Sequence, residues 1–136
     1  MTQRLLTRRD ALAAAAAFGA FPMLGMTAGS RMLTRPIPFD DEQLPVIGLG
    51  TYSVFDVAST PDAVAERLRI VELLVDAGGS VVDTSPMYNR SEQVIGDVIT
   101  AGAPRDKLFV ATKVWTDGRD AGVQQMKRSA QLMRTD

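Results

Sequence analysis

The chain has 136 residues, a formal net charge of -1 and 46% hydrophobic residues, which suits a single folded domain. The near-neutral charge, without a basic stripe, gives no reason to expect a nucleic acid partner. The sequence contains no cysteine and no histidine. Disulfides, thiolate nucleophiles and cysteine-ligated metals are therefore excluded, and no metal site is predicted.

The first thirty residues differ in composition from the rest. Three arginines, Arg4, Arg8 and Arg9, precede an apolar, alanine-rich run over residues 11–28. This is the layout of a signal peptide, and the paired arginines resemble a twin-arginine export signal. We therefore predict that residues 1–30 direct export to the periplasm through the twin-arginine machinery, with no stable membrane span after cleavage.

Two other interpretations of this segment stay open. An alanine-rich helix could belong to the fold, although no polar face interrupts the run. A retained membrane anchor is the second alternative, and the run is barely long enough to span a bilayer.

After the leader, short apolar strands alternate with amphipathic helices. Residues 31–45 contain three prolines and three acidic residues and are predicted to be irregular. The first helix begins at Ser59 or Thr60, where a hydroxyl cap is followed by a proline, and it stops at Gly78. The second helix is predicted to be capped by Ser91 and to end at Gly102. Strands are predicted over 46–49, 80–83 and 107–113, and a third helix over 120–133 with Val123, Met126, Ala130 and Met133 on one side.

Strands joined by helices run parallel, so the expected fold class is α/β with a parallel sheet over residues 31–136. In such folds the chemistry lies at the carboxyl ends of the strands. The first strand ends at Gly50, Thr51 and Tyr52, and the second at Asp83, with Tyr88 beyond it. The third ends at Lys113, followed by Trp115. We expect these residues to gather at one rim.

The residue types at this rim favour proton transfer. An ammonium group beside a phenol stabilises the phenolate and lowers a pKa that is normally about 10. A carboxylate such as Asp83 would hold Lys113 charged and in place, so Tyr88 could act as a general acid. That chemistry suits carbonyl reduction, in which oxygen takes a proton while carbon takes a hydride.

Two alternatives compete with this interpretation. Asp83 and Lys113 could form a plain buried ion pair, with Tyr88 as a rim aromatic. The run from Gly48 to Ser53 also partly matches the dinucleotide fingerprint, but a helix should begin directly after it and the predicted cap comes later.

Three segments together resemble the aldo-keto reductase family. They are LPVIGLGTYS from Leu44, VVDTSPMY from Val81 and LFVATKVW from Leu108, and they occur in the family's order and spacing. DTSPMY followed by SEQVIG also resembles an exported bacterial branch with twin-arginine leaders. The resemblance implies the N-terminal part, about three βα units, of an eight-stranded TIM barrel.

The resemblance also implies roles for the rim residues and an NADPH cofactor. Tyr88 would be the proton donor, Lys113 would assist it, and Asp83 would pair with Lys113 and reach the nicotinamide ribose. Gly50, Thr51 and Tyr52 would lie near the nicotinamide, and Tyr88 and Trp115 would wall the pocket for a small carbonyl substrate.

The sequence departs from the family at one catalytic position. The family uses a histidine after its fourth strand, and this sequence contains none. We therefore expect the sequence to be an incomplete piece of a longer reductase and to be inactive by itself. A non-catalytic, nucleotide-binding protein with a regulatory or assembly role is the alternative.

Overall fold

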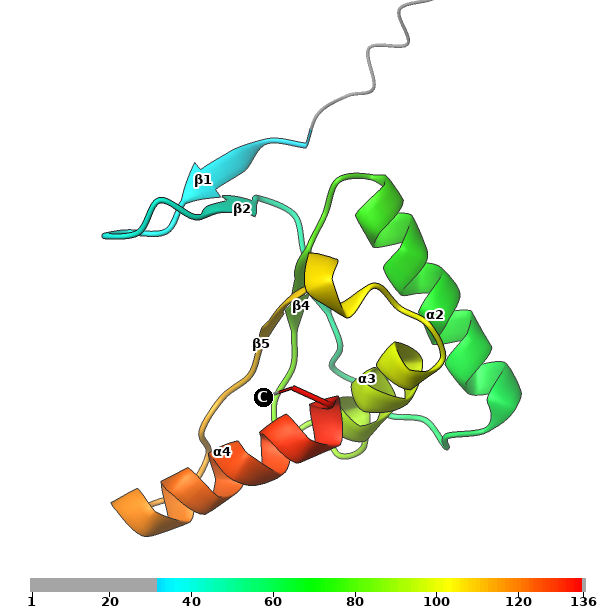
Figure 1. Cartoon of the computed structure of the whole chain (residues 1–136). Helices are drawn as coiled ribbons and strands as arrows, with labels where there is room; N and C mark the ends of the chain where they lie inside the picture. Colours follow the sequence, from blue (N-terminus) through cyan, green and yellow to red (C-terminus); the bar gives the residue numbers. More distant parts are fainter. Residues whose placement is uncertain (1–31, 136) are drawn as a thin grey trace, which may run out of the picture.

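The computed structural model describes residues 32–135, so the predicted leader lies outside the described residues (Figure 1). A hairpin comes first, and three strand–helix units follow it. The elements are β1 (Thr34–Pro36), β2 (Gln43–Pro45), β3 (Leu49–Gly50), α2 (Pro61–Asp76), β4 (Val81–Asp83), α3 (Ser91–Thr100), the short 3₁₀ helix η1 (Arg105–Lys107), β5 (Phe109–Ala111) and α4 (Arg119–Met133).

Strands β3, β4 and β5 form one parallel sheet in that order. Gly50 pairs with Asp83, and Asp83 pairs with Ala111, so the three strands end at the same level. The predicted α/β class is confirmed, and the three units β3–α2, β4–α3 and β5–α4 form a sheet that is open over the described residues. All residues that follow these strands therefore lie at one rim.

The segment expected to be irregular is instead an antiparallel hairpin, with Thr34 paired to Pro45 and Pro36 paired to Gln43. The prolines do deny a helix, but a two-stranded ribbon tolerates them at its ends, where no ladder donor is needed. The hairpin lies at the amino ends of the parallel strands, away from the rim (Figure 1).

The strands are shorter than predicted. The first was expected over Val46 to Leu49 but covers only Leu49–Gly50, and Val46 still bonds to Leu33 of the hairpin. The apolar side chain of Ile47 is 60% exposed, which shows that hydrophobicity alone did not place it in the sheet. Strands β3 and β4 end at the predicted residues, Gly50 and Asp83, whereas β5 ends at Ala111, two residues before its predicted end at Lys113.

Local signals set the ends of α2. Thr60 caps the helix by accepting a hydrogen bond from the Ala63 amide at 3.3 Å, and Pro61 and Asp62 occupy the first turn. Gly78, with φ of 85°, follows the last turn as predicted. Because α2 begins only at Pro61, no tight strand–turn–helix follows the glycines near Gly50, and the dinucleotide fingerprint is excluded there.

Helix α3 begins at the predicted residue but without the predicted cap. Arg90 occupies the N-cap position, and the fully buried Ser91 donates its hydroxyl to the Thr51 carbonyl oxygen at 3.3 Å. The serine was predicted from local preference alone, and a tertiary partner takes its hydroxyl instead.

Helix α4 buries only part of the face that its apolar residues predicted. Val123 and Met126 are 39% and 57% exposed, whereas Gly122, Ser129 and Met133 are buried. The core combines Phe55, Val71, Val82, Val94, Ile95, Val98, Ala103, Leu108 and Met133.

Packing against α3 explains the buried face of α4. A Cβ atom added to Gly96 would overlap the carbonyl of Leu132, so the two helices meet where a glycine allows close approach. This contact, rather than the apolar pattern, sets the rotation of α4.

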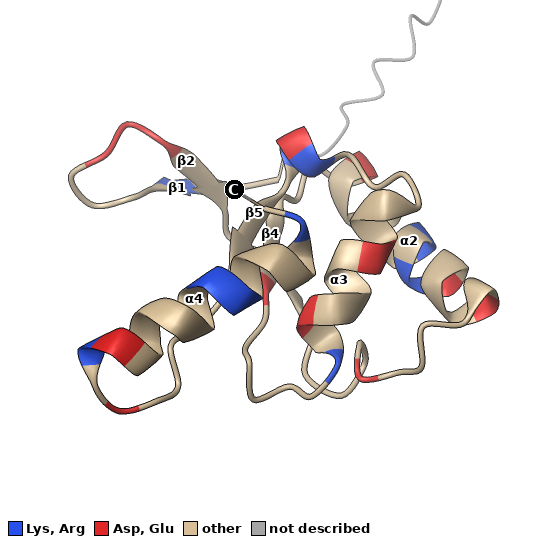
Figure 2. Ribbon diagram, turned by 60° about the horizontal axis from the view of Figure 1, so that its bottom comes forward, with Lys and Arg blue, Asp and Glu red and all other residues tan. Residues whose placement is uncertain are grey.

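The surface carries charges of both signs. Helix α2 carries basic and acidic residues, α4 has one acidic residue near its start and basic residues further along, and acidic residues mark the turn of the β1–β2 hairpin (Figure 2). Within residues 32–135, no helix combines the length and the hydropathy that crossing a membrane requires.

Candidate functional site

The predicted ion pair forms at the rim of the sheet. The Nζ atom of Lys113 donates hydrogen bonds to Asp83 Oδ1 at 3.0 Å and Oδ2 at 2.9 Å, and to the Thr84 carbonyl oxygen at 2.8 Å. The side chains of Lys113 and Asp83 are 41% and 48% exposed. The ion pair is therefore not buried over the described residues, because both groups remain open to solvent.

Tyr88 lies against this ion pair. The Lys113 ammonium is 5.1 Å from the centre of the Tyr88 ring, within the range of a cation–π contact. The Tyr52 ring meets Tyr88 edge-on, with centroids 5.2 Å apart and planes inclined by 68°. The structure therefore brings Asp83, Tyr88, Lys113 and Tyr52 together from three different strand ends.

The pKa of Lys113 lies above its ordinary value of 10.5. The main cause is the hydrogen bond to Asp83, and the negative charge of that carboxylate adds to it, while partial burial acts in the opposite direction. The lysine is therefore a permanent cation at neutral pH beside the phenol.

Backbone bonds hold the loop that carries Tyr88. The Tyr88 amide donates to the Ser85 carbonyl oxygen at 2.9 Å, and its own carbonyl oxygen accepts from the Ser91 amide at 2.9 Å. Asp56 fixes the far side of the loop by accepting from Asn89 Nδ2 at 2.8 Å. Asn89 adopts a positive φ of 49°, which asparagine tolerates better than most residues.

Gly50 and Thr51 border the site through their backbone. Thr51 is fully buried, and both its amide and its hydroxyl donate to the Asp83 carbonyl oxygen at 3.0 Å. The Thr51 hydroxyl thus fixes the backbone of Asp83, and the position of Thr51 near a nicotinamide stays a prediction. A Cβ at Gly50 would meet nothing within 4 Å, so the rim is open at this residue.

Trp115 is held by helix α4. Its amide donates to Gln125 Oε1, and its carbonyl oxygen accepts from Gln125 Nε2 at 3.2 Å. The indole is 64% exposed and borders a hollow of about 470 Å³ over residues 114–117. The role of Trp115 as a wall of a substrate pocket stays a prediction, and Gln125 is an anchor that the sequence did not indicate.

The sequence also did not predict a contact between the buried Glu92 and the exposed Thr112. Glu92 is only 3% exposed, and its Oε1 atom accepts from the Thr112 hydroxyl at 2.7 Å. A glutamate in the first turn of a helix is ordinary, so Glu92 does not stand out in the sequence. The signal is its burial, which only the packed structure reveals.

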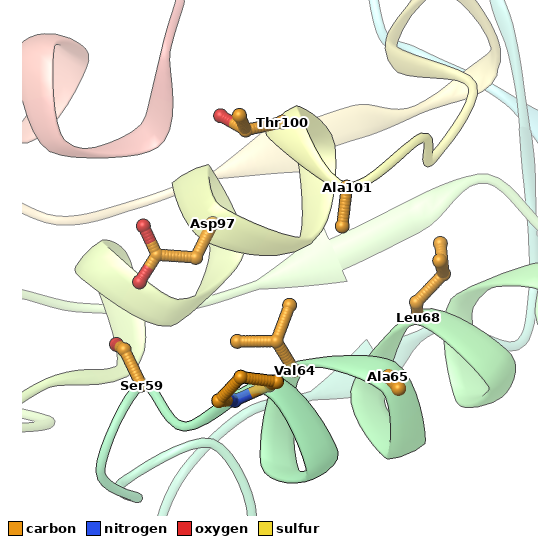
Figure 3. A pocket seen from close by; sticks show the side chains of 8 residues that line it. Ser59, Val64, Ala65, Leu68, Asp97, Thr100 and Ala101 are labelled. Carbon is orange, nitrogen blue, oxygen red and sulfur yellow. The ribbon is translucent and has the colours of Figure 1, made fainter.

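A second hollow lies between two helices, away from the strand ends. A groove of about 580 Å³ runs between α2 and α3, and Figure 3 shows its apolar floor of Val64, Ala65, Leu68 and Ala101. None of the rim residues lines this groove, so we keep the candidate site at the strand ends.

The rim offers a hydrogen-bond acceptor and an aromatic surface that could hold a ligand. The half-exposed carboxylate of Asp83 keeps acceptor capacity for a sugar hydroxyl, even with Lys113 bound to it. Tyr52, 70% exposed, offers an aromatic surface beside it. This donor set also suits a small polar substrate next to Tyr88.

Comparison with known families gives one match. The sequence model of the Aldo/keto reductase family matches residues 46–136. Methylglyoxal reductase DkgB of Salmonella typhi is 30% identical over 95 residues, covering 68% of this chain and 33% of that protein. An aldo-keto reductase of Mycolicibacterium vanbaalenii is 39% identical over 85 residues, 62% of this chain and 27% of that protein.

Solved structures agree with the sequence relatives. A putative aldo-keto reductase from Pseudomonas aeruginosa superposes with a TM-score of 0.64 at 25% identity, over 82% of this chain and 46% of that one. An aldo-keto reductase from Klebsiella pneumoniae, solved with NADPH, gives a TM-score of 0.61 at 25% identity, over 77% and 37% of the two chains. The likeness identifies the fold as part of a (β/α)8 barrel. The chain spans about a third of the length of the curated relatives it matches.

Proposed function

We propose that this chain, which belongs to the aldo/keto reductase family, supplies the proton-donating part of a site that reduces an aldehyde or ketone to an alcohol with NADPH. The observation that carries the proposal is the contact of Lys113 with both the Asp83 carboxylate and the Tyr88 ring. A tyrosine beside a lysine and a carboxylate at one strand rim suits general acid catalysis at a carbonyl oxygen.

In the proposed reaction, Tyr88 donates its phenolic proton to the carbonyl oxygen of the substrate. Bound NADPH supplies the hydride that the carbonyl carbon takes up, and the two transfers together give the alcohol. Lys113, fixed by Asp83, places a positive charge against the Tyr88 ring and stabilises the phenolate that the transfer leaves behind. Solvent would then return a proton to the Tyr88 phenolate and complete the cycle.

The cofactor proposal rests on the chemistry of the rim. Asp83 would accept a hydrogen bond from the nicotinamide ribose, and Tyr52 would lie along the nicotinamide. Gly50 leaves the backbone approachable, and Thr51 keeps Asp83 in position. NADPH is favoured over other cofactors because the related Klebsiella enzyme was solved with it.

The test is a reduction assay on the whole protein. NADPH oxidation is followed with aromatic aldehydes and with methylglyoxal, and the alcohol product is identified by chromatography. We expect oxidation that depends on the carbonyl compound. Binding of NADPH without reduction of any aldehyde or ketone would favour a regulatory nucleotide-binding role instead.

The 136-residue chain by itself is expected to be inactive. Its parallel sheet is open over the described residues, so the rim offers only part of a barrel mouth for cofactor and substrate. Turnover measured with this chain alone would contradict that expectation.

We also propose that residues 1–30 are a twin-arginine leader that exports the protein to the periplasm. The support is the order of Arg8 and Arg9 before an alanine-rich run. In cell fractionation, the wild-type protein should be periplasmic, and the paired R8K and R9K substitutions should retain it in the cytoplasm. Export that is unaffected by the paired lysines would contradict the twin-arginine route.

A further inference from the structure

The first turn of α3 is connected to both outer strand ends of the sheet. Ser91 Oγ donates to the carbonyl oxygen of Thr51, which follows β3, at 3.3 Å. Glu92 Oε1 accepts from the hydroxyl of Thr112, which follows β5, at 2.7 Å. Two adjacent residues of one helix therefore reach the strands on either side of β4.

These bonds continue into the ion pair and close a ring. Thr51 donates twice to the Asp83 carbonyl oxygen, at 3.0 Å in each bond. Lys113, the residue after Thr112, donates to both carboxylate oxygens of Asp83. The ring thus runs from Ser91 through Thr51, Asp83, Lys113 and Thr112 back to Glu92, which neighbours Ser91.

The members of this hydrogen-bonded ring differ in their burial. Ser91 and Thr51 are fully buried and Glu92 is 3% exposed, whereas Asp83 and Lys113 are about half exposed and Thr112 is exposed as well. A buried hydrogen-bonded side chain has few alternative partners, while an exposed lysine has many rotamers and water to bond with. The conformations of the buried residues are therefore restricted by packing, whereas Asp83 and Lys113 depend on their hydrogen bonds to keep one conformation.

We propose that Glu92 is a positioning residue, which acts through Thr112 to hold Lys113 on Asp83 and beside Tyr88. The buried carboxylate of Glu92 anchors Thr112, the residue immediately before Lys113. The backbone of Lys113 is thereby held at a fixed distance from Asp83. Ser91 does the same for Thr51 on the opposite side. The catalytic consequence rests on the proposed function, but the positioning itself does not.

The test therefore measures the titration of Lys113 itself and needs no catalytic activity. In the full 136-residue chain, the ε-methylene signal of Lys113 is followed by NMR while the pH is raised, and it is assigned by its loss in K113M. Thr112→Val removes the hydroxyl that donates to Glu92. Thr112→Ser keeps that donor, and Glu92→Gln keeps an oxygen that can accept from Thr112. The groups facing Lys113 are Asp83 and Tyr88, and both are unchanged in all of these variants.

We expect the Lys113 titration midpoint to fall in T112V toward the ordinary value of 10.5 and to stay at its wild-type position in T112S and E92Q. T112V leaves a buried carboxylate without its donor, which itself destabilises a fold. The double variant E92L/T112V replaces both partners by apolar groups of similar shape, which often changes the stability little. Its Lys113 titration midpoint should fall as in T112V.

The outcomes separate the positioning role from the proposed function. A wild-type midpoint in folded T112V, or in the folded double variant, overturns the proposal, and so does failure of both variants to fold, because the ring would then serve folding alone. If the midpoint falls as expected but the whole protein reduces no carbonyl compound, the proposed function fails and the positioning role stands. If reduction does occur, T112V should lower kcat by up to about 100-fold, with T112S close to wild type.

Discussion

Lys113 and Asp83 lie thirty positions apart in the chain, yet the lysine nitrogen is 3.0 Å and 2.9 Å from the two carboxylate oxygens. Both side chains are about half exposed. Exposed ion pairs contribute only about 0–1 kcal/mol to the free energy of folding. The contact is therefore weak support for stability, and its value lies in placing a fixed cation beside Tyr88.

Replacing Tyr88 by phenylalanine should remove the proton donor and leave the ring that contacts Lys113 and Tyr52. We expect kcat for carbonyl reduction by the whole protein to fall about 100- to 10,000-fold, the usual contribution of general acid catalysis. NADPH affinity, measured by fluorescence titration, should change little. A Y88F protein with wild-type kcat would show that another group supplies the proton.

Replacing Lys113 by methionine should remove the cation but keep much of the aliphatic side chain. We expect kcat to fall about 100- to 1000-fold, as when one charge-stabilising group is removed from an active site. Lys107→Met is the matched control, because Lys107 is exposed and lies at the amino end of the same strand, away from the rim. Equal losses in K113M and K107M would show that the effect is not local to the site.

The ion pair should leave a signature in the pH dependence of stability. The hydrogen bond to Asp83 raises the pKa of Lys113 above 10.5, so the charged lysine favours the folded state. This contribution is fully present below about pH 10.5 and is lost as the pH rises through the folded pKa. It should be small, because the pair is exposed.

Asp83→Asn provides the comparison. Urea unfolding should show a difference in the free energy of unfolding between wild type and D83N that is constant at neutral pH and decreases above pH 10.5. The Lys113 titration itself should move down in D83N. A difference that grows with rising pH would have the wrong sign and would contradict this account of the pair.

Gly96 should tolerate no side chain, because a Cβ there overlaps the carbonyl of Leu132 on α4. We expect Gly96→Ala to destabilise the chain by about 1–3 kcal/mol or more, the usual cost of overpacking. Gly50→Ala is the steric control, since a Cβ at Gly50 meets nothing within 4 Å. Thermal unfolding compares the two, and equal midpoints would contradict the close approach of α3 and α4.

Much of the fold could be read from local chemistry. Thr60 and Pro61 marked the start of α2, Gly78 marked its end, and the apolar runs marked the parallel strands. From the alternation of strands and helices, the sequence then predicted that Asp83 and Lys113 lie at one rim. Strand ends in a parallel sheet share an edge, so sequence order was enough to make this prediction.

Tertiary packing decided what local preference could not. Ser91 was expected to cap α3 but bonds to Thr51, and Val123 and Met126 were expected to face inward but are exposed. The sequence by itself determined the element order, the family resemblance and the residues at the rim, because these depend on neighbours along the chain. Only the folded structure decided that Glu92 is buried behind the rim and that Thr51 holds Asp83, because those bonds join residues that sequence distance keeps apart.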